Sequence, residues 1–203
     1  MFNRNRSVMM CTAIFSVLTC AAYAQCGGSE VLPACASPYG YSLAEIARAT
    51  AVYNTGIQAG SPLTPPPPDV PFQVLVGDAT VRPDTIFYVP IYVVDDSGGA
   101  PAGFPTDINN QRADAACLEG VVFGLYGVTD LIVQVDGKTT VLNNGYIAGV
   151  RTPPLLDGTP AGTHYIVSAV FLTPLAPGKH TVGIGGIIGG APVVFVSYNV
   201  TVR

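Results

Sequence analysis

A change of period at Val70 constrains the fold of this chain more than any other feature of its sequence. From there to the C-terminus, apolar residues alternate with polar ones or form short β-branched runs, separated by Gly, Pro, Asn or Asp. A period of two is typical of strands with one buried face. The pattern predicts about seven short strands, over 72–76, 85–94, 131–135, 138–142, 164–172, 179–184 and 193–202. Strands of this length and spacing predict a mainly β fold, an immunoglobulin-like antiparallel β-sandwich, over residues 70–203.

Three phrases predict local details of this sandwich. Asp136-Gly137 between two strands predicts a type I′ turn, in which both central residues take a positive φ. Pro90 lacks the N–H that a ladder needs, so its strand is expected to lie at a sheet edge or to contain a bulge. Pro177-Gly178-Lys179-His180 predicts an architectural turn in which Gly178 takes a positive φ and His180 starts a strand.

The residues before the sandwich predict an N-terminal extension, 25–69, with one helix. Ser42 and Glu45 have the spacing of a capping box, and apolar residues then recur at helical spacing over 43–53. Gly56 and Gly60 are expected to end this helix, and the proline-rich stretch 61–68 predicts an extended connector. A second short helix is expected over 109–119, with Asn109 or Asn110 as its cap.

The first 24 residues have the three parts of a secretory signal peptide. A short stretch with Arg4 and Arg6 precedes an apolar run, and Ala22-Tyr23-Ala24 supplies the small residues that signal peptidase reads. The apolar run is too short for a spanning helix. We therefore expect cleavage after Ala24 and export by the general secretory route to the periplasm or the outside of the cell. An uncleaved membrane anchor is the alternative.

Charge limits the partners that the mature chain is expected to bind. The whole chain has 9 Lys and Arg against 13 Asp and Glu, and cleavage removes two arginines, so 7 remain against 13 and the net charge becomes −6. Without a basic patch, nucleic acid is not an expected partner. Charged residues make up only 11% of the chain, well below the roughly 25% of ordinary soluble domains. Such a surface favours packing against an unknown protein or surface partner, and self-association is open.

Three cysteines, Cys26, Cys35 and Cys117, remain after cleavage. In an oxidising compartment close pairs tend to form disulfides, so Cys26–Cys35 is the favoured pairing. Three single pairings are open, and the sequence does not exclude Cys117 as a partner. An unpaired Cys117 is interpreted as a small apolar core residue.

A succession of phrases resembles one group of exported bacterial proteins. The phrases are Phe87-Tyr-Val-Pro-Ile-Tyr-Val-Val-Asp-Asp-Ser97, Phe104-Pro105, Val135-Asp-Gly137, Arg151-Thr-Pro153 and Leu175-Ala-Pro-Gly-Lys-His-Thr-Val182. The group is an uncharacterised family of β-sandwich, immunoglobulin-like proteins with an LxPGxHT phrase near the C-terminus. The resemblance covers about residues 41–203. It implies an exported compartment and a sandwich fold, and it carries no activity to transfer.

The candidate catalytic residues have structural interpretations that fit the sequence better. His164 and Ser168 lie on one face of a strand by parity, but no acidic residue has a defined place beside them, and no serine has a Gly-x-Ser-x-Gly context. His180 follows a turn, where an imidazole bonds to neighbouring backbone. We therefore assign no catalytic residue and no cofactor.

Calcium is the one metal for which the sequence offers weak candidates. Asp95 and Asp96 precede a Ser-Gly-Gly turn, and Asp107 is expected to return to the same end of the sandwich. The spacing of an EF-hand is absent, so a solvated turn is the simpler interpretation. Ligand spacing for zinc is absent as well.

The expected function is that of an exported, non-catalytic module that binds a partner or forms part of an envelope or surface structure. The alternative is a secreted, hydrolase-like enzyme whose site is assembled from dispersed residues. Convergence in one cleft would favour the enzyme, and the residues concerned are Asp95, Asp107, Arg151, His164 and His180.

Overall fold

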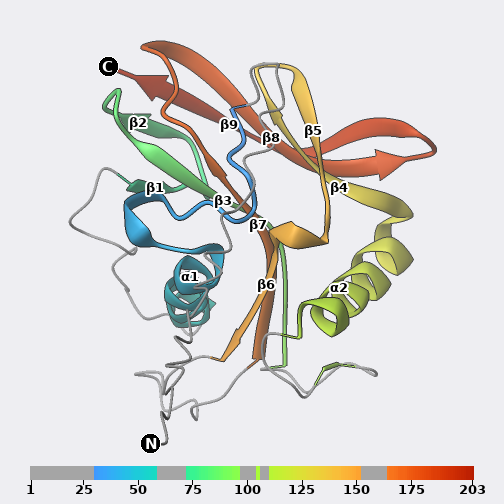
Figure 1. The fold of residues 1–203 in the computed structure, drawn as a ribbon. Helices are drawn as coiled ribbons and strands as arrows, with labels where there is room; N and C mark the ends of the chain where they lie inside the picture. Colours follow the sequence, from blue (N-terminus) through green and yellow to red (C-terminus); the bar gives the residue numbers. More distant parts are fainter. Residues whose placement is uncertain (1–29, 59–71, 97–103, 106–109, 152–163) are drawn as a thin grey trace, which may run out of the picture.

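Two β-sheets face each other across a shared core in the computed structural model (Figure 1), which describes residues 30–58, 72–96, 104–105, 110–151 and 164–203. One sheet has the order β1 (Phe72–Val74), β3 (Ile86–Asp95), β7 (His164–Leu172), β6 (Ile147–Arg151). The other has the order β2 (Ala79–Val81), β9 (Ala191–Val202), β8 (Gly178–Ile188), β4 (Val128–Val135), β5 (Lys138–Leu142). The expected mainly β sandwich is confirmed.

The strand pairing is antiparallel except at two sheet edges, where β1 runs parallel to β3 and β2 runs parallel to β9. Each expected strand region contains a strand, while β2 and β6 were not expected. β2 spans only three residues, and in β6 the β-branched Ile147 and Val150 are separated by Ala148 and Gly149, so neither strand has the run of β-branched residues that would predict it. β6 nevertheless forms one edge of the four-stranded sheet.

β7 organises the core because all nine of its residues are buried. Ile166, Val170 and Leu172 face the core between the two sheets. Tyr165, Val167 and Phe171 face the opposite side, where they pack with Leu43 and Ile46 of α1 (Leu43–Gln58). The helix α2 (Gln111–Tyr126) packs on the other face through Ala115 and Leu118, so the two helices lie on opposite sides of β6 and β7 (Figure 1).

Both helices begin where the sequence predicts and end later. The Ser42 N–H donates to Glu45 Oε2 at 2.8 Å and the Glu45 N–H to Ser42 Oγ at 3.3 Å, which confirms the capping box. Asn110, one of the two residues predicted as the cap, caps α2 by accepting the Ala113 N–H. The helices reach Gln58 and Tyr126, so the prediction that Gly56 stops α1 was wrong. α2 still packs against the core through Phe123, so the helix extends beyond residues 109–119, over which it was predicted.

The predicted turns are present. Asp136 and Gly137 have φ values of 48° and 82°, as the type I′ hairpin between β4 and β5 requires. Gly178 has φ of 146°, and β8 starts there, two residues before the predicted start at His180. The register of β3 shifts between Pro90 and Tyr92, so the proline marks a bulge; β3 lies between β1 and β7, not at an edge.

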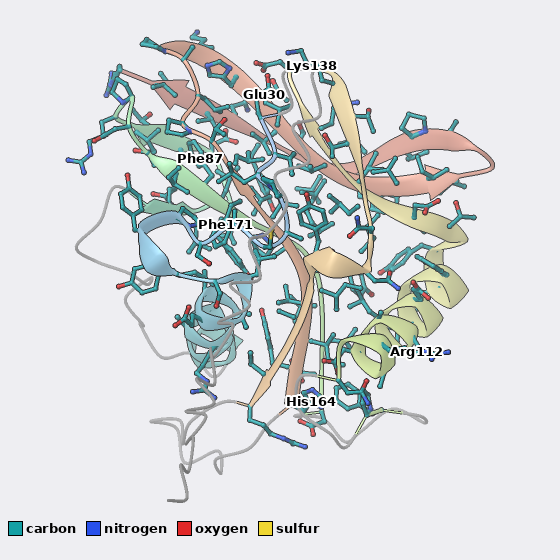
Figure 2. The ribbon with its side chains drawn as sticks, in the orientation of Figure 1. Glu30, Phe87, Arg112, Lys138, His164 and Phe171 are labelled. Atoms are coloured by element: carbon teal, nitrogen blue, oxygen red, sulfur yellow. The ribbon has the colours of Figure 1, made fainter. Side chains whose placement is uncertain are left out.

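The extension packs directly on the sandwich. Val31 bridges to Leu172, and the Leu32 N–H donates to the carbonyl of Phe171 at 2.8 Å. Glu30 forms an ion pair of 3.1 Å with Lys138 of β5, and Figure 2 labels both. These contacts connect the first described residues to both sheets.

The end of the β8–β9 hairpin carries an uncharged, exposed surface. The sequence from Thr181 to Val202 contains no Asp, Glu, Lys, Arg or His. Val193, Val194, Phe195 and Val196 are each between 38% and 46% exposed, and Phe195 lies beside Tyr126 of α2, with ring centroids 6.1 Å apart. Within the described residues, no helix is long and apolar enough to cross a membrane.

Candidate functional site

A cavity of about 520 Å³ lies beside α2 and draws its walls from both sheets. Its lining residues come from α2, β4, β5, the turn η2 (Asn144–Tyr146), β6 and β7. They are Leu118, Glu119, Phe123, Thr129, Asp130, Leu131, Leu142, Asn143, Asn144, Gly145, Ile147 and Ser168. A volume of this size falls in the range of roughly 300–1,000 Å³ that is common for small-molecule sites. We call it the interlayer pocket.

The interlayer pocket combines buried apolar side chains with exposed polar ones. Leu118, Leu131, Leu142 and Ile147 are buried members of the core, whereas Asp130, Asn143 and Asn144 are exposed. Among the described residues that line the pocket, only Glu119 and Asp130 are charged, and both are acidic. The pocket therefore suits a ligand with an apolar body, and its charge opposes anions.

A second, smaller cavity of about 310 Å³ adjoins the interlayer pocket, with which it shares Gly145 and Ile147. Its other lining residues are Ala34, Ser42, Leu43, Ala44, Asp114, Ala148 and Gly149. It therefore lies between the start of α1 and the edge strand β6, and Asp114 of α2 contributes the charged side chain of its lining. We call it the Asp114 cavity.

Asp114 is fully buried, although it is a carboxylic acid. Oδ1 lies 3.5 Å from Nε2 of His164, which is also fully buried and is labelled in Figure 2. Oδ2 packs against Gly149, where a Cβ atom would overlap it. Within the described residues, neither carboxylate oxygen has a hydrogen-bond partner, and neither does Nε2 of His164. Burial raises the pKa of Asp114, and the charge of His164 opposes that shift.

His164 is held by backbone and ring contacts that fix its orientation. Its Nδ1 lies 2.9 Å from the carbonyl of Pro105, which only accepts, so Nδ1 carries a proton. The ring of Phe104 meets the imidazole edge-on, with centroids 5.2 Å apart. Because Nδ1 is bonded to a carbonyl and Nε2 faces Asp114 in the buried interior, neither nitrogen is placed to take a proton from a substrate.

Asp96, which follows β3, contacts His164 of β7 and Arg151 of β6 next to the Asp114–His164 pair. It accepts the His164 N–H at 2.7 Å and lies 3.7 Å from the guanidinium of Arg151, which is opposite His164 in the β6–β7 register. The structure thus brings Asp96, Arg151 and His164 together. Asp95 is the register partner of Tyr165, and Asp107 lies outside the described residues.

The contacts of Asp96 bear on the calcium prediction. One carboxylate oxygen accepts a backbone N–H and the other faces a guanidinium, so its charge is already used inside the fold. No group of three potential metal ligands occurs among the described residues. Because Asp107 is outside them, calcium binding by Asp95, Asp96 and Asp107 stays a prediction.

The sequence predicts that His164 and Ser168 share one face of a strand. In the structure Ser168 lines the interlayer pocket, and its side chain is 1% exposed. Sequence reasoning missed Asp114, the acidic partner of His164. The signal was available: Asp114 is flanked by Ala113, Ala115 and Ala116 and lies four residues before Leu118, on the apolar face of the helix. An acid in such a position is a candidate buried group.

His180 belongs to a separate pair, at the turn between β4 and β5. Nδ1 lies 2.7 Å from Oδ2 of Asp136, and Nε2 lies 2.7 Å from the carbonyl of Ala176. Asp136 also accepts the Thr181 N–H at 2.8 Å. Both ring nitrogens face acceptors, so the imidazolium, which has two donors, fits this site best. The arrangement fastens one hairpin to the start of β8, as the architectural interpretation expects.

We expect this pair to make stability depend on pH. The hydrogen bond to Asp136 raises the pKa of His180 above its ordinary value of 6.5. Burial alone would raise the pKa of Asp136, but its bonds to His180 and Thr181 and the nearby positive charges lower it below 3.8. The stabilisation is therefore fully present between pH 3.8 and pH 6.5 and is lost as the pH rises through the folded pKa of His180 or falls through that of Asp136.

The measurement is a comparison of melting temperatures for wild type and His180→Gln. Near pH 5.5 the variant should melt about 2 °C lower, the effect of a partly exposed ion pair worth ~0.5–1 kcal/mol. Near pH 9 the difference should shrink, because the wild-type imidazole is then neutral. An equal difference at both pH values would show that the charge of His180 does not contribute.

The described cysteines are consistent with the favoured pairing and do not test it. Cys26 lies outside the described residues, so the pairing Cys26–Cys35 stays a prediction. Cys117 is free and packs against the core, as the apolar interpretation expects. Burial raises the pKa of its thiol, and the charge of Asp114 adds to this. A half-buried thiol of raised pKa is a poor nucleophile.

Comparisons with known proteins give little on which to base a function. No protein-family model matches the chain, and no curated protein matches it. Among solved structures, the chain is similar to the crystal structure of the cysteine protease inhibitor EhICP2 from Entamoeba histolytica, with 12% identity and a TM-score of 0.26, over 65% of this chain and 96% of that one. A likeness at that score carries no argument about function.

Proposed function

We propose that the protein is an exported, non-catalytic binding module whose ligand occupies the interlayer pocket. The observation that carries the proposal is the pocket itself: about 520 Å³ between two sheets, with buried leucines beside exposed amides and one exposed acid, Asp130. Such a cavity removes an apolar group from water, at about 25 cal/mol per Å² of apolar surface buried, while the polar residues orient it. The ligand is a small molecule with an apolar body.

The exported compartment is part of the same proposal. The tripartite segment 1–24 supports it, and a disulfide at Cys35 would agree with it, because disulfides persist in oxidising compartments. The proposed pairing is Cys26–Cys35. The bacterial origin rests on the resemblance of the phrases near Phe87 and Leu175 to exported bacterial sandwiches, which stays a prediction.

The positions of the two histidines favour binding over hydrolysis. His164 faces Asp114 and a backbone carbonyl in the buried interior, and His180 bonds two acceptors 2.7 Å away. A general base needs one ring nitrogen within reach of a substrate. Neither imidazole offers one, so both contribute to the architecture.

A single tryptophan placed in the interlayer pocket tests the proposal. The chain contains no tryptophan, so Phe123→Trp introduces one emitter at a half-buried aromatic position that lines the pocket. We expect a saturable change in its emission when 1-hexanol, a small neutral probe with an apolar chain, is titrated into the protein. The same titration of Phe195→Trp reports on the exposed hairpin, which does not line the pocket.

The two reporters separate the two apolar surfaces. A response in Phe123→Trp without a response in Phe195→Trp places binding in the interlayer pocket. A saturable response in Phe195→Trp alone would mean that the hairpin binds the probe and the pocket does not. No response in either protein would also contradict the proposal.

A further inference from the structure

Asp114 is a buried acid that lacks the hydrogen bonds such a group ordinarily has. It is fully buried, and within the described residues neither carboxylate oxygen has a hydrogen-bond partner. Nε2 of His164 lies 3.5 Å from Oδ1 of Asp114 and makes no hydrogen bond to it. A buried carboxylate without donors is costly, and native structures explain most such groups by a missing ion, water or ligand.

The surroundings of Asp114 provide space for a missing donor. Asp114 lines the Asp114 cavity, whose volume is about 310 Å³, with Ser42 and Leu43 at the start of α1 and Gly149 of β6. This cavity adjoins the interlayer pocket, because Gly145 and Ile147 line both. The two linings together contain three acids and, among the described residues, no Lys, Arg or His.

We propose that the Asp114 cavity is an ammonium subsite, and that the ligand of this protein is a primary amine on an apolar chain. The inference rests on the proposed function, because the chain of the amine occupies the interlayer pocket. The ammonium group supplies three N–H donors and a positive charge to the oxygens of Asp114, neither of which has a hydrogen bond within the described residues. Apolar contacts for the chain come from Ile147, which lines both cavities, and from Leu118, which lines the interlayer pocket one helical turn after Asp114.

Other occupants fit these observations less well. Anions are opposed by Glu119, Asp130 and Asp114. A bound metal ion needs several ligands, and no group of three His, Cys, Asp or Glu residues occurs in the described part of the chain. A neutral alcohol supplies one donor and no charge, so it satisfies the carboxylate only in part.

Three probes of equal chain length test the subsite. Hexylammonium, 1-hexanol and hexanoate are titrated into the full-length Phe123→Trp protein, and each dissociation constant is measured from the emission. We expect hexylammonium to bind at least about tenfold more tightly than 1-hexanol, the effect of a charge-assisted hydrogen bond, and hexanoate to bind more weakly than either.

Asp114→Asn in the same background removes the charge at nearly constant size. It should abolish the preference for hexylammonium over 1-hexanol. Asp84→Asn is the matched control: it makes the same change at an exposed residue that is paired with Arg82 and lines neither cavity, and it should keep the preference. If Asp114→Asn fails to fold, the comparison of the three probes in the Phe123→Trp protein, which keeps Asp114, still tests the subsite.

Each result has one meaning. Equal binding of hexylammonium and 1-hexanol would overturn the ammonium subsite and leave the interlayer pocket standing. A preference for hexylammonium that persists in Asp114→Asn would overturn the role of Asp114. If none of the probes binds, the subsite and the proposed function both fall.

Discussion

Gly149→Ala is expected to destabilise the protein by about 3 kcal/mol, because a Cβ atom at this position would overlap Oδ2 of Asp114. Residue 149 lies on β6, whose backbone is fixed by its register with β7, and Asp114 is fixed by the packing of α2. The new methyl group must therefore displace a buried carboxylate from His164. Urea unfolding of the variant and the wild type measures the loss in the free energy of unfolding, and equal m-values show that the two unfolding transitions are comparable.

Gly124→Ala is the matched control, since it makes the same chemical change on the exposed side of α2. A Cβ atom there meets nothing within 4 Å, and α2 is helical at this residue. Alanine should stabilise the protein by ~0.5–1 kcal/mol through helix propensity and a less flexible unfolded chain. Similar stability changes for Gly149→Ala and Gly124→Ala would contradict the placement of Asp114.

Gly185→Ala should be the second large effect, at about 2–3 kcal/mol of lost stability. In β8, the added Cβ atom would overlap the carbonyl oxygen of Val193 and lie 2.9 Å from Cα of Val194. These are backbone atoms of β9 at a register shift, where no rotamer change relieves the clash. Urea unfolding gives the total loss, and amide hydrogen exchange along β9 shows whether the hairpin opens first.

Gly183→Ala is the control for this hairpin. Its nearest neighbour would be Cγ1 of Val194 at 2.9 Å, a side-chain atom that can move by rotation about χ1. Gly183→Ala should therefore cost less than Gly185→Ala. If both variants unfold at the same urea concentration as the wild type, the close approach of β8 and β9 is not present in solution.

Local sequence signals predicted most of the fold. The capping box of Ser42 and Glu45, the Asp136-Gly137 turn and the glycine at 178 each depend on a few neighbouring residues, and all three are confirmed. The end of α2 and the existence of β6 depend on packing that the local sequence does not contain. Phe123 extends the helix because it packs against the core, and β6 forms because it pairs with β7, with Asp114 in the space that a side chain at Gly149 would occupy.

The candidate site was less accessible to sequence reasoning than the fold. His164 and Ser168 were recognised as sharing a strand face, but Asp114 lies fifty residues earlier, on a helix, and only the packing of α2 against β6 and β7 brings it to His164. Residues from six elements line the interlayer pocket, so no single segment of the sequence predicts it. His180 and Asp136 were both identified as turn residues, and their pairing depends on how two hairpins meet.

Chemical-shift mapping of the ligand site tests the central claim most directly. Hexylammonium is titrated into uniformly ¹⁵N-labelled protein of native sequence, and the amide shifts are followed residue by residue. The account predicts saturable shifts at Leu118, Leu131 and Ser168 of the interlayer pocket and at Gly149 of the Asp114 cavity. Shifts confined to the exposed residues 193–196 of β9, or no saturable shifts at all, would contradict it.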